Sequence, residues 1–340
     1  MSHFIRLRTH RDFESTITLE SGIYLITLKN GPSDAIWFYD ESLPEDFLNP
    51  LKKYVQPSSM MAVAPKEKGK SFESFQAMLT FLDRFDVSSS TEIFALGGGA
   101  LTDAVGFVAS LYLRGLKLTF IPTTLLAMVD ASIGGKTALN TTFKNRIGSF
   151  YPAHQILIDF EFLKTMPQPL IEDGMVEIIK IALLFDEAWV KALETHSISL
   201  EDSIQKAIEH KIDVVKKDLN DQNERKLLNL GHTLGHAIEA FHHFKVSHGT
   251  CVAWGLLLEH QQKEFYPRIK ALLKSYGCIK DIKTPVNELM PYLLKDKKRA
   301  GSTLDMIELT SIGQARIRKT TLDELKNDLM SMKESIHDKP

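Results

Sequence analysis

The sequence predicts a chain in two parts: an α/β N-terminal half with a mostly parallel sheet, and a mostly α-helical C-terminal half. In the first half, short apolar runs rich in β-formers alternate with amphipathic segments, and three glycines directly follow one of those runs. After the proline-rich stretch 166–169, apolar residues recur at helical spacing. We therefore predict domains at residues 1–165 and 166–340.

Each element of the first half is predicted from its local pattern. Strands are expected at 35–40, 60–65, 92–96, 116–121 and 156–159, where apolar residues and β-formers gather in short runs. The stretch 16–30 is also rich in β-formers and is interrupted by turn residues. Helices are expected at 71–85, from about 101 to a basic-then-glycine end at 114–115, and in the tail 320–340.

The glycine turn Gly97–Gly99 lies between a buried strand and a helix. Without Cβ atoms, backbone N–H groups can approach a pyrophosphate, and the helix N-terminus adds a favourable partial charge. A bare turn is an equal alternative, because the GxGxxG fingerprint is absent. Asp103 in the next turn is also favoured there by the helix dipole. The hydroxyls of Thr123 and Thr124, after the following strand, are expected to meet a ribose or nicotinamide.

A second glycine turn carries Lys136 in the sequence Gly-Gly-Lys-Thr. It resembles a P-loop, but Asp130 stands where the GxxxxGK[ST] pattern requires glycine, which disfavours a nucleoside triphosphate site. A lysine on a glycine turn is still a good ligand for one phosphate or carboxylate. Lys144 and Asn145 supply further donors shortly after it.

Glu177 and Lys180 lie one turn apart on an otherwise apolar helical segment. A surface ion pair is one interpretation. The flanking Val176 and Ile178 favour burial instead, where a lone carboxylate is costly unless it binds a cation.

The segment Arg225–Glu239 is interpreted as one helix, which would place Arg225, Asn229, His232 and His236 on a single stripe. A buried helix with satisfied core histidines is the alternative, and four functional residue types in one row disfavour it. Two imidazoles one turn apart can bind a divalent metal or divide into ligand and acid–base roles.

One carboxylate and two imidazoles are predicted to form a metal site. Glu177 and His232 belong to the segments just described, and His248 opens a further apolar helix. This ligand set is typical of catalytic zinc and leaves room for a substrate oxygen.

Composition excludes several classes of protein. The chain has 340 residues, 44% of them hydrophobic, and a net charge of −2, so it can bury a large core, and the charge argues against a nucleic-acid partner. Cys251 and Cys278 form no disulfide framework, which suits a reducing compartment. With no apolar leader and no apolar run near ~18 residues, we expect a soluble, cytoplasmic protein without a membrane partner.

The motifs, taken together, resemble the 3-dehydroquinate synthase family in order and approximate spacing, densely over residues 60–255. They are GGGALTDAVGF, YLRG, IPTTLLAMVDASIGGKT, KNRIGSF, VEIIK, RKLLNLGHTLGHAIE and SHG. The resemblance implies a Rossmann-like NAD-binding α/β domain followed by a mostly α-helical metal-binding domain, usually in a homodimer.

The resemblance also assigns residues. It implies that Zn²⁺, or Co²⁺ in its place, is held by Glu177, His232 and His248. It implies a substrate pocket of Lys136, Asn145, Lys180, Lys211, Arg225, Asn229, His236 and Asp130. It implies that NAD is surrounded by Asp40, Glu67, Lys70, Gly98, Gly99, Asp103, Thr123, Thr124, Lys136, Lys144, Asn145 and Thr165. Arg114 would reach the substrate phosphate in the neighbouring subunit.

The implied reaction converts 3-deoxy-D-arabino-heptulosonate 7-phosphate to 3-dehydroquinate and phosphate. In the family, this combines transient oxidation by NAD, phosphate elimination, re-reduction and an aldol closure. Thr102 and Asp221 depart from the family's usual Gly and Glu.

The residues also bear on three alternatives to this reaction. Another sugar-phosphate cyclase is disfavoured because Lys211 and Arg225 would lack a carboxylate to pair with. A metal-dependent alcohol dehydrogenase would lack the phosphate-binding cations found here. An inactive relative is disfavoured by the intact ligands.

Overall fold

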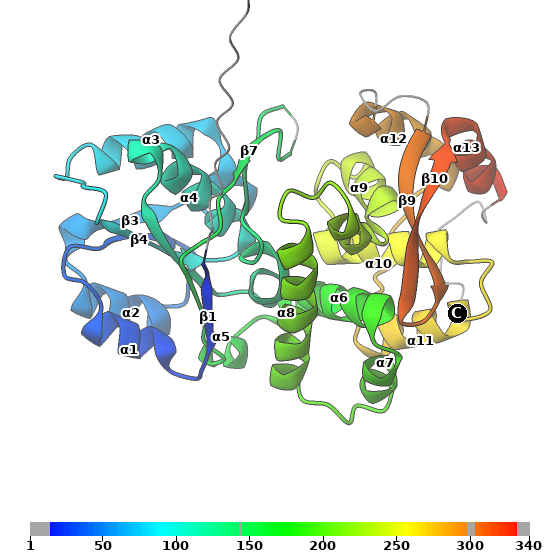
Figure 1. Cartoon of the computed structure of the whole chain (residues 1–340), viewed down its shortest axis with the longest axis horizontal. Coiled ribbons are helices and arrows are strands. Elements are labelled where there is room, and N and C mark those ends of the chain that lie inside the picture. The colour runs from blue at the N-terminus through cyan, green and yellow to red at the C-terminus, as the bar shows by residue number, and fades with distance from the viewer. Residues whose placement is uncertain (1–13, 143, 298–302, 332–340) are drawn as a thin grey trace, which may run out of the picture.

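The N-terminal half is built on a six-stranded parallel sheet (Figure 1), in the order β1-β8-β5-β4-β2-β3. The computed structural model describes residues 14–142, 144–297 and 303–331. The strands of this sheet are β1 Thr16–Leu19, β2 Ile36–Asp40, β3 Met60–Val63, β4 Glu92–Gly97, β5 Lys117–Pro122 and β8 Gln155–Ile158. The predicted α/β class, with a mostly parallel sheet, is confirmed.

Helices pack on the faces of this sheet. They are α1 Ile23–Asn30, α2 Glu45–Tyr54, α3 Phe72–Leu82, α4 Gly99–Leu111 and the short α5 Glu161–Lys164. The stretch 16–30, rich in β-formers and interrupted by turn residues, is strand in β1 and helix in α1. The carboxylate of Asp159 accepts hydrogen bonds from the backbone N–H groups of Gly22 and Tyr24, at 2.9 and 3.0 Å. This distant partner satisfies the start of α1, and a local pattern cannot reveal it.

The strand order reverses between β2 and β4, because the chain moves from β2 to β3 on one side and from β4 to β5 on the other. In open α/β sheets, ligands bind at such a point, beyond the carboxyl ends of the strands. Asp40 ends β2 and Gly97 ends β4. A Cβ atom on Gly97 would lie 3.1 Å from the Cβ of Asp40, so the two strand ends are in contact.

A small antiparallel hairpin and a π-helical turn lie beside the large sheet. The hairpin pairs β6 Lys136–Leu139 with β7 Ile147–Phe150, and the turn covers Ala127–Ala131. These elements were not predicted. Gly134 and Gly135, both with positive φ, reverse the chain between the turn and Lys136.

The C-terminal half is mostly helical, as predicted, and also contains a hairpin that was not. Its helices are α6 Gln168–Phe185, α7 Glu187–Glu194, α8 Leu200–Lys217, α9 His232–Phe241, α10 His248–Glu259, α11 Tyr266–Ser275, α12 Met290–Lys297 and α13 Leu322–Ser331. The hairpin joins β9 Thr303–Ser311 to β10 Gln314–Thr321. α13 confirms the start of the predicted tail helix, and residues 332–340 lie outside the described residues.

The segment Arg225–Glu239 is not one helix, contrary to the sequence-based interpretation. A 3₁₀ helix, Glu224–Asn229, precedes α9, and between them Gly231 has φ +74°. The carboxylate of Glu259 accepts from the backbone N–H of Gly231 at 3.0 Å and of Leu234 at 3.3 Å. These bonds satisfy N–H groups at the start of α9, so the chain breaks where periodicity predicts continuity.

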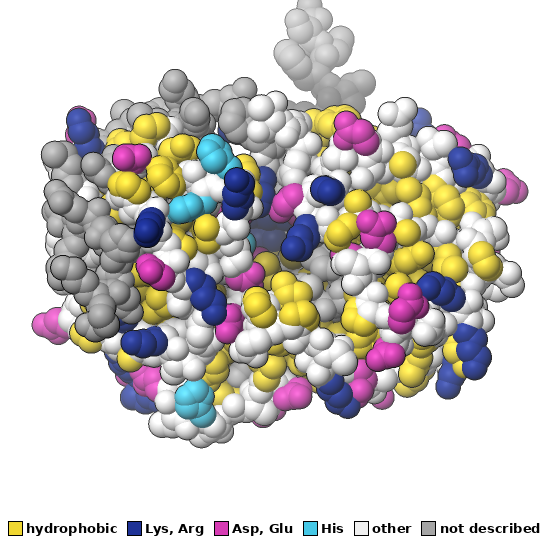
Figure 2. All heavy atoms as spheres, turned by 180° about the vertical axis from the view of Figure 1, so that it is seen from behind, with side chains coloured by type: hydrophobic (Ala, Val, Ile, Leu, Met, Phe, Trp, Pro, Cys, Tyr) yellow, Lys and Arg dark blue, Asp and Glu magenta, His cyan; other side chains and the backbone are white. Residues whose placement is uncertain are grey.

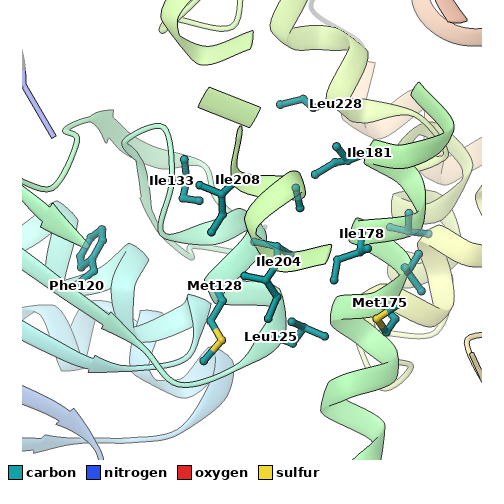
Figure 3. Close-up of a cluster of buried hydrophobic side chains, with 14 of the residues drawn as sticks. Phe120, Leu125, Met128, Ile133, Met175, Ile178, Ile181, Ile204, Ile208 and Leu228 are labelled. Atoms are coloured by element: carbon teal, nitrogen blue, oxygen red, sulfur yellow. The ribbon is translucent and has the colours of Figure 1, made fainter. Parts of the chain in front are cut away.

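The hydrophobic core runs without interruption from the sheet to helices α6 and α8 (Figure 3). Phe120 of β5 and Met128 of the π-helical turn belong to the same cluster as Ile178 of α6 and Ile204 of α8. The two halves are therefore packed directly on one another, while the boundary at 165/166 stays a prediction. Among the residues that the structure describes, no helix has the length and apolarity needed to span a bilayer.

Candidate active site

A cavity of about 440 Å³ lies between the two halves. Figure 2 shows the molecule hollowed near the middle of one face, with basic and acidic side chains at the rim. The cavity is lined by eight of the predicted site residues: Asp103, Asp130, Lys136, Asn145, Lys180, Lys211, Arg225 and Asn229. The candidate metal ligand His232 also lines it.

Glu177, His232 and His248 converge, as predicted, although they come from α6, α9 and α10. The Oε1 atom of Glu177 is 3.8 Å from His232 Nε2 and 3.9 Å from His248 Nε2. One ligand atom from each of the three lies within 4.8 Å of the others. A single divalent cation placed between them would meet all three.

The two oxygens of Glu177 have different surroundings. Oε2 accepts a hydrogen bond from Lys180, one turn along α6, and both side chains are buried. The surface ion pair considered from sequence is therefore ruled out. Oε1 is buried and has no hydrogen-bond partner within the described part of the chain. A buried carboxylate oxygen without a partner is costly, so this atom fits a metal ion between Glu177 and the two imidazoles.

His232 is held in the tautomer that a metal ligand needs. Its Nδ1 lies 3.0 Å from the carbonyl oxygen of Leu230, where Nδ1–H donates and Nε2 keeps its lone pair. Burial lowers the pKa of His232 well below its ordinary value, and the positive charge of Lys180 lowers it further. The imidazole is therefore neutral at pH 7, as ligation requires.

Packing between α9 and α10 brings His248 to this site. A Cβ atom on Gly231 would lie 2.7 Å from Leu256 Cγ, and one on Gly255 would lie 1.9 Å from the carbonyl oxygen of Gly231. Only residues without side chains permit this approach. Ser247 caps α10, because its hydroxyl accepts from the backbone N–H of Thr250 at 3.4 Å.

Another three-residue group, His236, Glu239 and His248, also has metal-binding geometry. Its carboxylate is already engaged, because Lys144 Nζ lies 2.7 Å from Glu239 Oε1. Burial would raise the pKa of Glu239, but His248 and Lys144 lower it to about 2. The Glu177 group, with its unpartnered oxygen, is the better metal site.

Lys211 and Arg225 also line the cavity, and both are buried. Lys211 Nζ donates to the carbonyl oxygen of Asp130 at 2.5 Å and also to its carboxylate. Burial alone would raise the pKa of Asp130, but Lys211 and Lys180 hold it well below its ordinary value. Arg225 donates through Nη1 to the carbonyl oxygens of Gly134 and Leu219, at 2.8 and 2.6 Å.

Lys136 lies at the mouth of the cavity and is half-exposed. Its Nζ is 2.5 Å from the carboxylate of Asp221. Asp221 itself has φ +56°. Asp221 was not predicted as a site residue, and the structure shows that it is the partner of Lys136.

The candidate cofactor residues fall into two clusters. Asp40, Thr123, Thr124 and the turn Gly98–Gly99 surround the strand ends. A Cβ on Gly98 would lie 3.2 Å from Thr124 Cγ2, and Thr123 donates its backbone N–H to Gly97 at 3.0 Å.

The second cluster lies beside the first turns of α4. Lys70 Nζ lies 2.6 Å from Asp103 and 2.5 Å from the side-chain oxygen of Asn145. Burial raises the pKa of Asp103 despite the neighbouring Lys70. Glu67 accepts from Asn140 at 2.6 Å and pairs with Lys144 at 3.1 Å.

Among the predicted residues that do not line the cavity in this chain are Arg114, Thr165 and His236. Arg114 is exposed, with φ +67°, at the end of the 3₁₀ turn after α4. Thr165 is exposed after α5. His236 is exposed, one turn beyond His232, with ring centroids 5.2 Å apart. Glu239 was missed as a site residue, although it closes the same GHTLGHAIE motif that carries both histidines.

Known proteins resemble this chain over most of its length. Residues 60–173 match the family model for the 3-dehydroquinate synthase N-terminal domain, and residues 174–299 match that for the C-terminal domain. The 3-dehydroquinate synthase of Clostridium perfringens is 38% identical over 78% of this chain and 80% of its own length. That of Pyrococcus furiosus is 33% identical, over 89% and 93%.

Solved structures extend the comparison. The 2-epi-5-epi-valiolone synthase of Streptomyces hygroscopicus, solved with NAD⁺ and Zn²⁺ bound, is 25% identical, covers 96% of this chain and 99% of its own, and has a TM-score of 0.83. An iron-containing alcohol dehydrogenase is 17% identical over 94% of this chain and 97% of its own; with a TM-score of 0.57, it shares the fold alone. The family models and the curated relatives together show that this chain belongs to the 3-dehydroquinate synthase family.

Proposed function

We propose that this chain converts 3-deoxy-D-arabino-heptulosonate 7-phosphate to 3-dehydroquinate and phosphate, with NAD and one Zn²⁺. The observation that carries the proposal is a single cavity lined by the candidate metal ligand His232 and by the buried cations Lys180, Lys211 and Arg225. Its lining therefore suits a substrate that has hydroxyls to bind a metal and anionic groups to pair with cations.

Glu177, His232 and His248 would hold the metal, Zn²⁺ by analogy with the valiolone synthase or Co²⁺ in its place. Bound there, the ion would polarise a substrate hydroxyl. Lys180 neutralises the second oxygen of Glu177, which leaves Oε1 for the ion. Asn229, which lines the cavity as His232 does, is assigned to a substrate hydroxyl.

The cofactor would lie at the switch point of the sheet, where backbone N–H groups at the start of α4 can meet a pyrophosphate. It would supply a reversible hydride transfer, with no net redox over the cycle. Asp40 and Asp103 are assigned to ribose hydroxyls, and Glu67, Lys70, Lys144 and Thr165 to the surrounding contacts.

Lys211 and Arg225 are assigned to the substrate carboxylate. Arg225 contacts both carbonyls through one nitrogen, and we assign its other N–H donors to the substrate. Lys136, Asn145 and His236 are assigned to the substrate phosphate. Since a phosphate oxygen can accept a proton, the leaving group held by these residues can itself serve as the base. Asp130 pairs with Lys211 and favours its charged form, which burial disfavours.

We further propose a homodimer in the cytoplasm, with Arg114 reaching the partner's site. Two large exposed apolar side chains, Leu111 and Leu113, flank the approach to Arg114. Ile147 and Phe150, on β7, are also exposed. A side-chain hydrogen bond joins β7 to the end of α4, so these side chains belong to the same region. This exposed apolar surface surrounds Arg114. It supports a second copy of the chain as the partner that covers it.

The test is phosphate release from the seven-carbon phosphate with Zn²⁺ and substoichiometric NAD⁺. Many turnovers per NAD⁺, without accumulation of NADH, are expected. Stoichiometric accumulation of NADH would instead identify a net dehydrogenase, and turnover of a substrate without the carboxylate would identify another cyclase.

A further inference from the structure

Glu239 is a buried carboxylate on α9. It faces the candidate metal ligand His248 but does not belong to the group of Glu177, His232 and His248. Its Oε2 lies 3.7 Å from His248 Nδ1, while the opposite ring nitrogen, Nε2, lies 3.9 Å from Glu177 Oε1. The two nitrogens of His248 are thus directed at different carboxylates.

This arrangement determines which ring nitrogen of His248 is available to bind a metal. A histidine that binds a metal through Nε2 carries its proton on Nδ1, and a carboxylate beside Nδ1–H stabilises that tautomer and raises the basicity of the ligand. Glu239 occupies that position.

Glu239 is itself held from the other half of the molecule. Lys144 lies in the loop between β6 and β7, and its Nζ is 2.7 Å from Glu239 Oε1. The same ammonium is 3.1 Å from Glu67 Oε1 and 4.6 Å from the centroid of the Phe244 ring. Since Lys144 binds one oxygen of Glu239, the other remains directed at His248.

We propose that Glu239 is a positioning residue for His248 and that Lys144 holds Glu239, so metal affinity depends on a residue of the sheet-bearing half. The inference rests on the proposed function in taking Glu177, His232 and His248 as the metal site. Lys144 was assigned above only to contacts around the cofactor. The proposal gives it a second role, in support of the metal site.

The experiment measures Zn²⁺ affinity by competition with a chromophoric chelator, in the absence of NAD and substrate. Glu239→Gln keeps the shape but removes the charge, and the expected loss is about 10- to 100-fold. Lys144→Met is expected to weaken Zn²⁺ binding in the same direction, and Lys144→Arg to restore it. The visible spectrum of the Co²⁺-loaded variants should change with Glu239→Gln. Lys263→Met, which breaks a distant ion pair with Glu308, is the matched control and should leave affinity unchanged.

A double variant tests whether the two residues act in series. If Lys144 works through Glu239, then Lys144→Met with Glu239→Gln binds Zn²⁺ no more weakly than Glu239→Gln alone. Circular dichroism of the metal-free proteins checks folding, and Glu239→Asp, expected to lie between wild type and Glu239→Gln, replaces the amide if that variant does not fold.

Three results would overturn the proposal. Zn²⁺ affinity within twofold of wild type in Glu239→Gln removes the role of Glu239. A Lys144→Met variant that loses NAD affinity but keeps Zn²⁺ affinity leaves Lys144 as a cofactor residue alone. Two equivalents of bound Zn²⁺ would show that Glu239 is a ligand of a second ion. None of these measurements uses turnover, so they stay separate from a failure of the proposed reaction.

Discussion

At the scale of single residues, the site is defined by which buried charges have partners. Lys180, Lys211 and Arg225 are all buried cations, and each has an oxygen partner on another residue. Glu177 differs, because one of its oxygens has no partner among the described residues. This difference identifies the place for a cation and leads to the first prediction.

Replacing His232 with Ala should abolish stoichiometric zinc and phosphate release while the fold is retained, because one of three ligands is lost. Elemental analysis, with circular dichroism, measures this. The matched control is His236→Ala, one turn away and exposed, which should keep zinc but release phosphate more slowly. A full equivalent of zinc in the His232 variant would refute the ligand assignment.

Arg225→Lys and Lys211→Met should weaken recognition of the substrate carboxylate. Losing one charge-assisted contact in a desolvated site should cost about 2–4 kcal/mol in transition-state binding, or roughly 30- to 1000-fold in kcat/KM. Steady-state kinetics on the seven-carbon phosphate measures it, with an analogue lacking the carboxylate as control. Equal losses on both substrates would show that these cations do not read a carboxylate.

At the scale of elements, glycines decide how the site-bearing segments approach one another. Gly98 lets the start of α4 lie against Thr124, and Gly231 lets the start of α9 lie against Leu256. At both positions the missing side chain permits a contact between distant segments, and each contact supports a prediction.

Gly98→Val should weaken NAD binding, because its Cβ would lie 3.2 Å from Thr124 Cγ2 and its methyl groups would block backbone approach to a pyrophosphate. Calorimetry of NAD binding measures the effect. Affinity equal to that of wild type would argue against this turn as the cofactor site.

Gly231→Ala should destabilise the protein more than Gly22→Ala does. Both glycines have positive φ, so each substitution costs about 1–2 kcal/mol in backbone strain. At Gly22 the new Cβ meets no atom within 4 Å, whereas at Gly231 it would lie 2.7 Å from Leu256 Cγ. The added overpacking should cost roughly 1–3 kcal/mol more. Urea unfolding measures the free energy of unfolding of both variants. Equal losses of stability would mean that the α9–α10 contact adjusts to the added methyl group without an energetic penalty.

At the scale of the whole molecule, one continuous core joins the sheet to the helices, and ion pairs attach the β9–β10 hairpin to the helical half. Glu308 of β9 pairs with Lys263 after α10 at 2.6 Å and with Arg316 of β10 at 2.7 Å. The Lys263 hydrogen bond is the largest cause that lowers the pKa of Glu308, to about 2. The hairpin's attachment should therefore depend on pH.

Because the folded-state pKa of Glu308 lies below its ordinary value of 4.5, its contribution to stability is complete above pH ~4.5 and declines as pH falls toward 2. Glu308→Gln should thus lower the free energy of unfolding at pH 7 and narrow the gap from wild type at pH 3. Urea unfolding at both pH values measures this. A pH-independent difference between the two proteins would contradict the assignment. Screening reduces the magnitude, because Arg316 is largely exposed.

The sequence by itself indicated most strands of the large sheet and the helical texture of the second half, and its motifs named candidate site residues. Each of these depends on local patterns: apolar runs for strands, and motif order for the residues. The run Thr303–Ser311, rich in apolar and β-branched residues and followed by Gly313, also carries strand and turn signals for the β9–β10 hairpin.

Tertiary structure decided the features whose causes lie far away in the chain. The break before α9 depends on Glu259, and the start of α1 depends on Asp159. The pairing of Glu239 with Lys144 joins residues from different halves. Local periodicity reports how each segment prefers to fold, but a distant carboxylate that satisfies backbone N–H groups or a cation is determined only when the segments pack together.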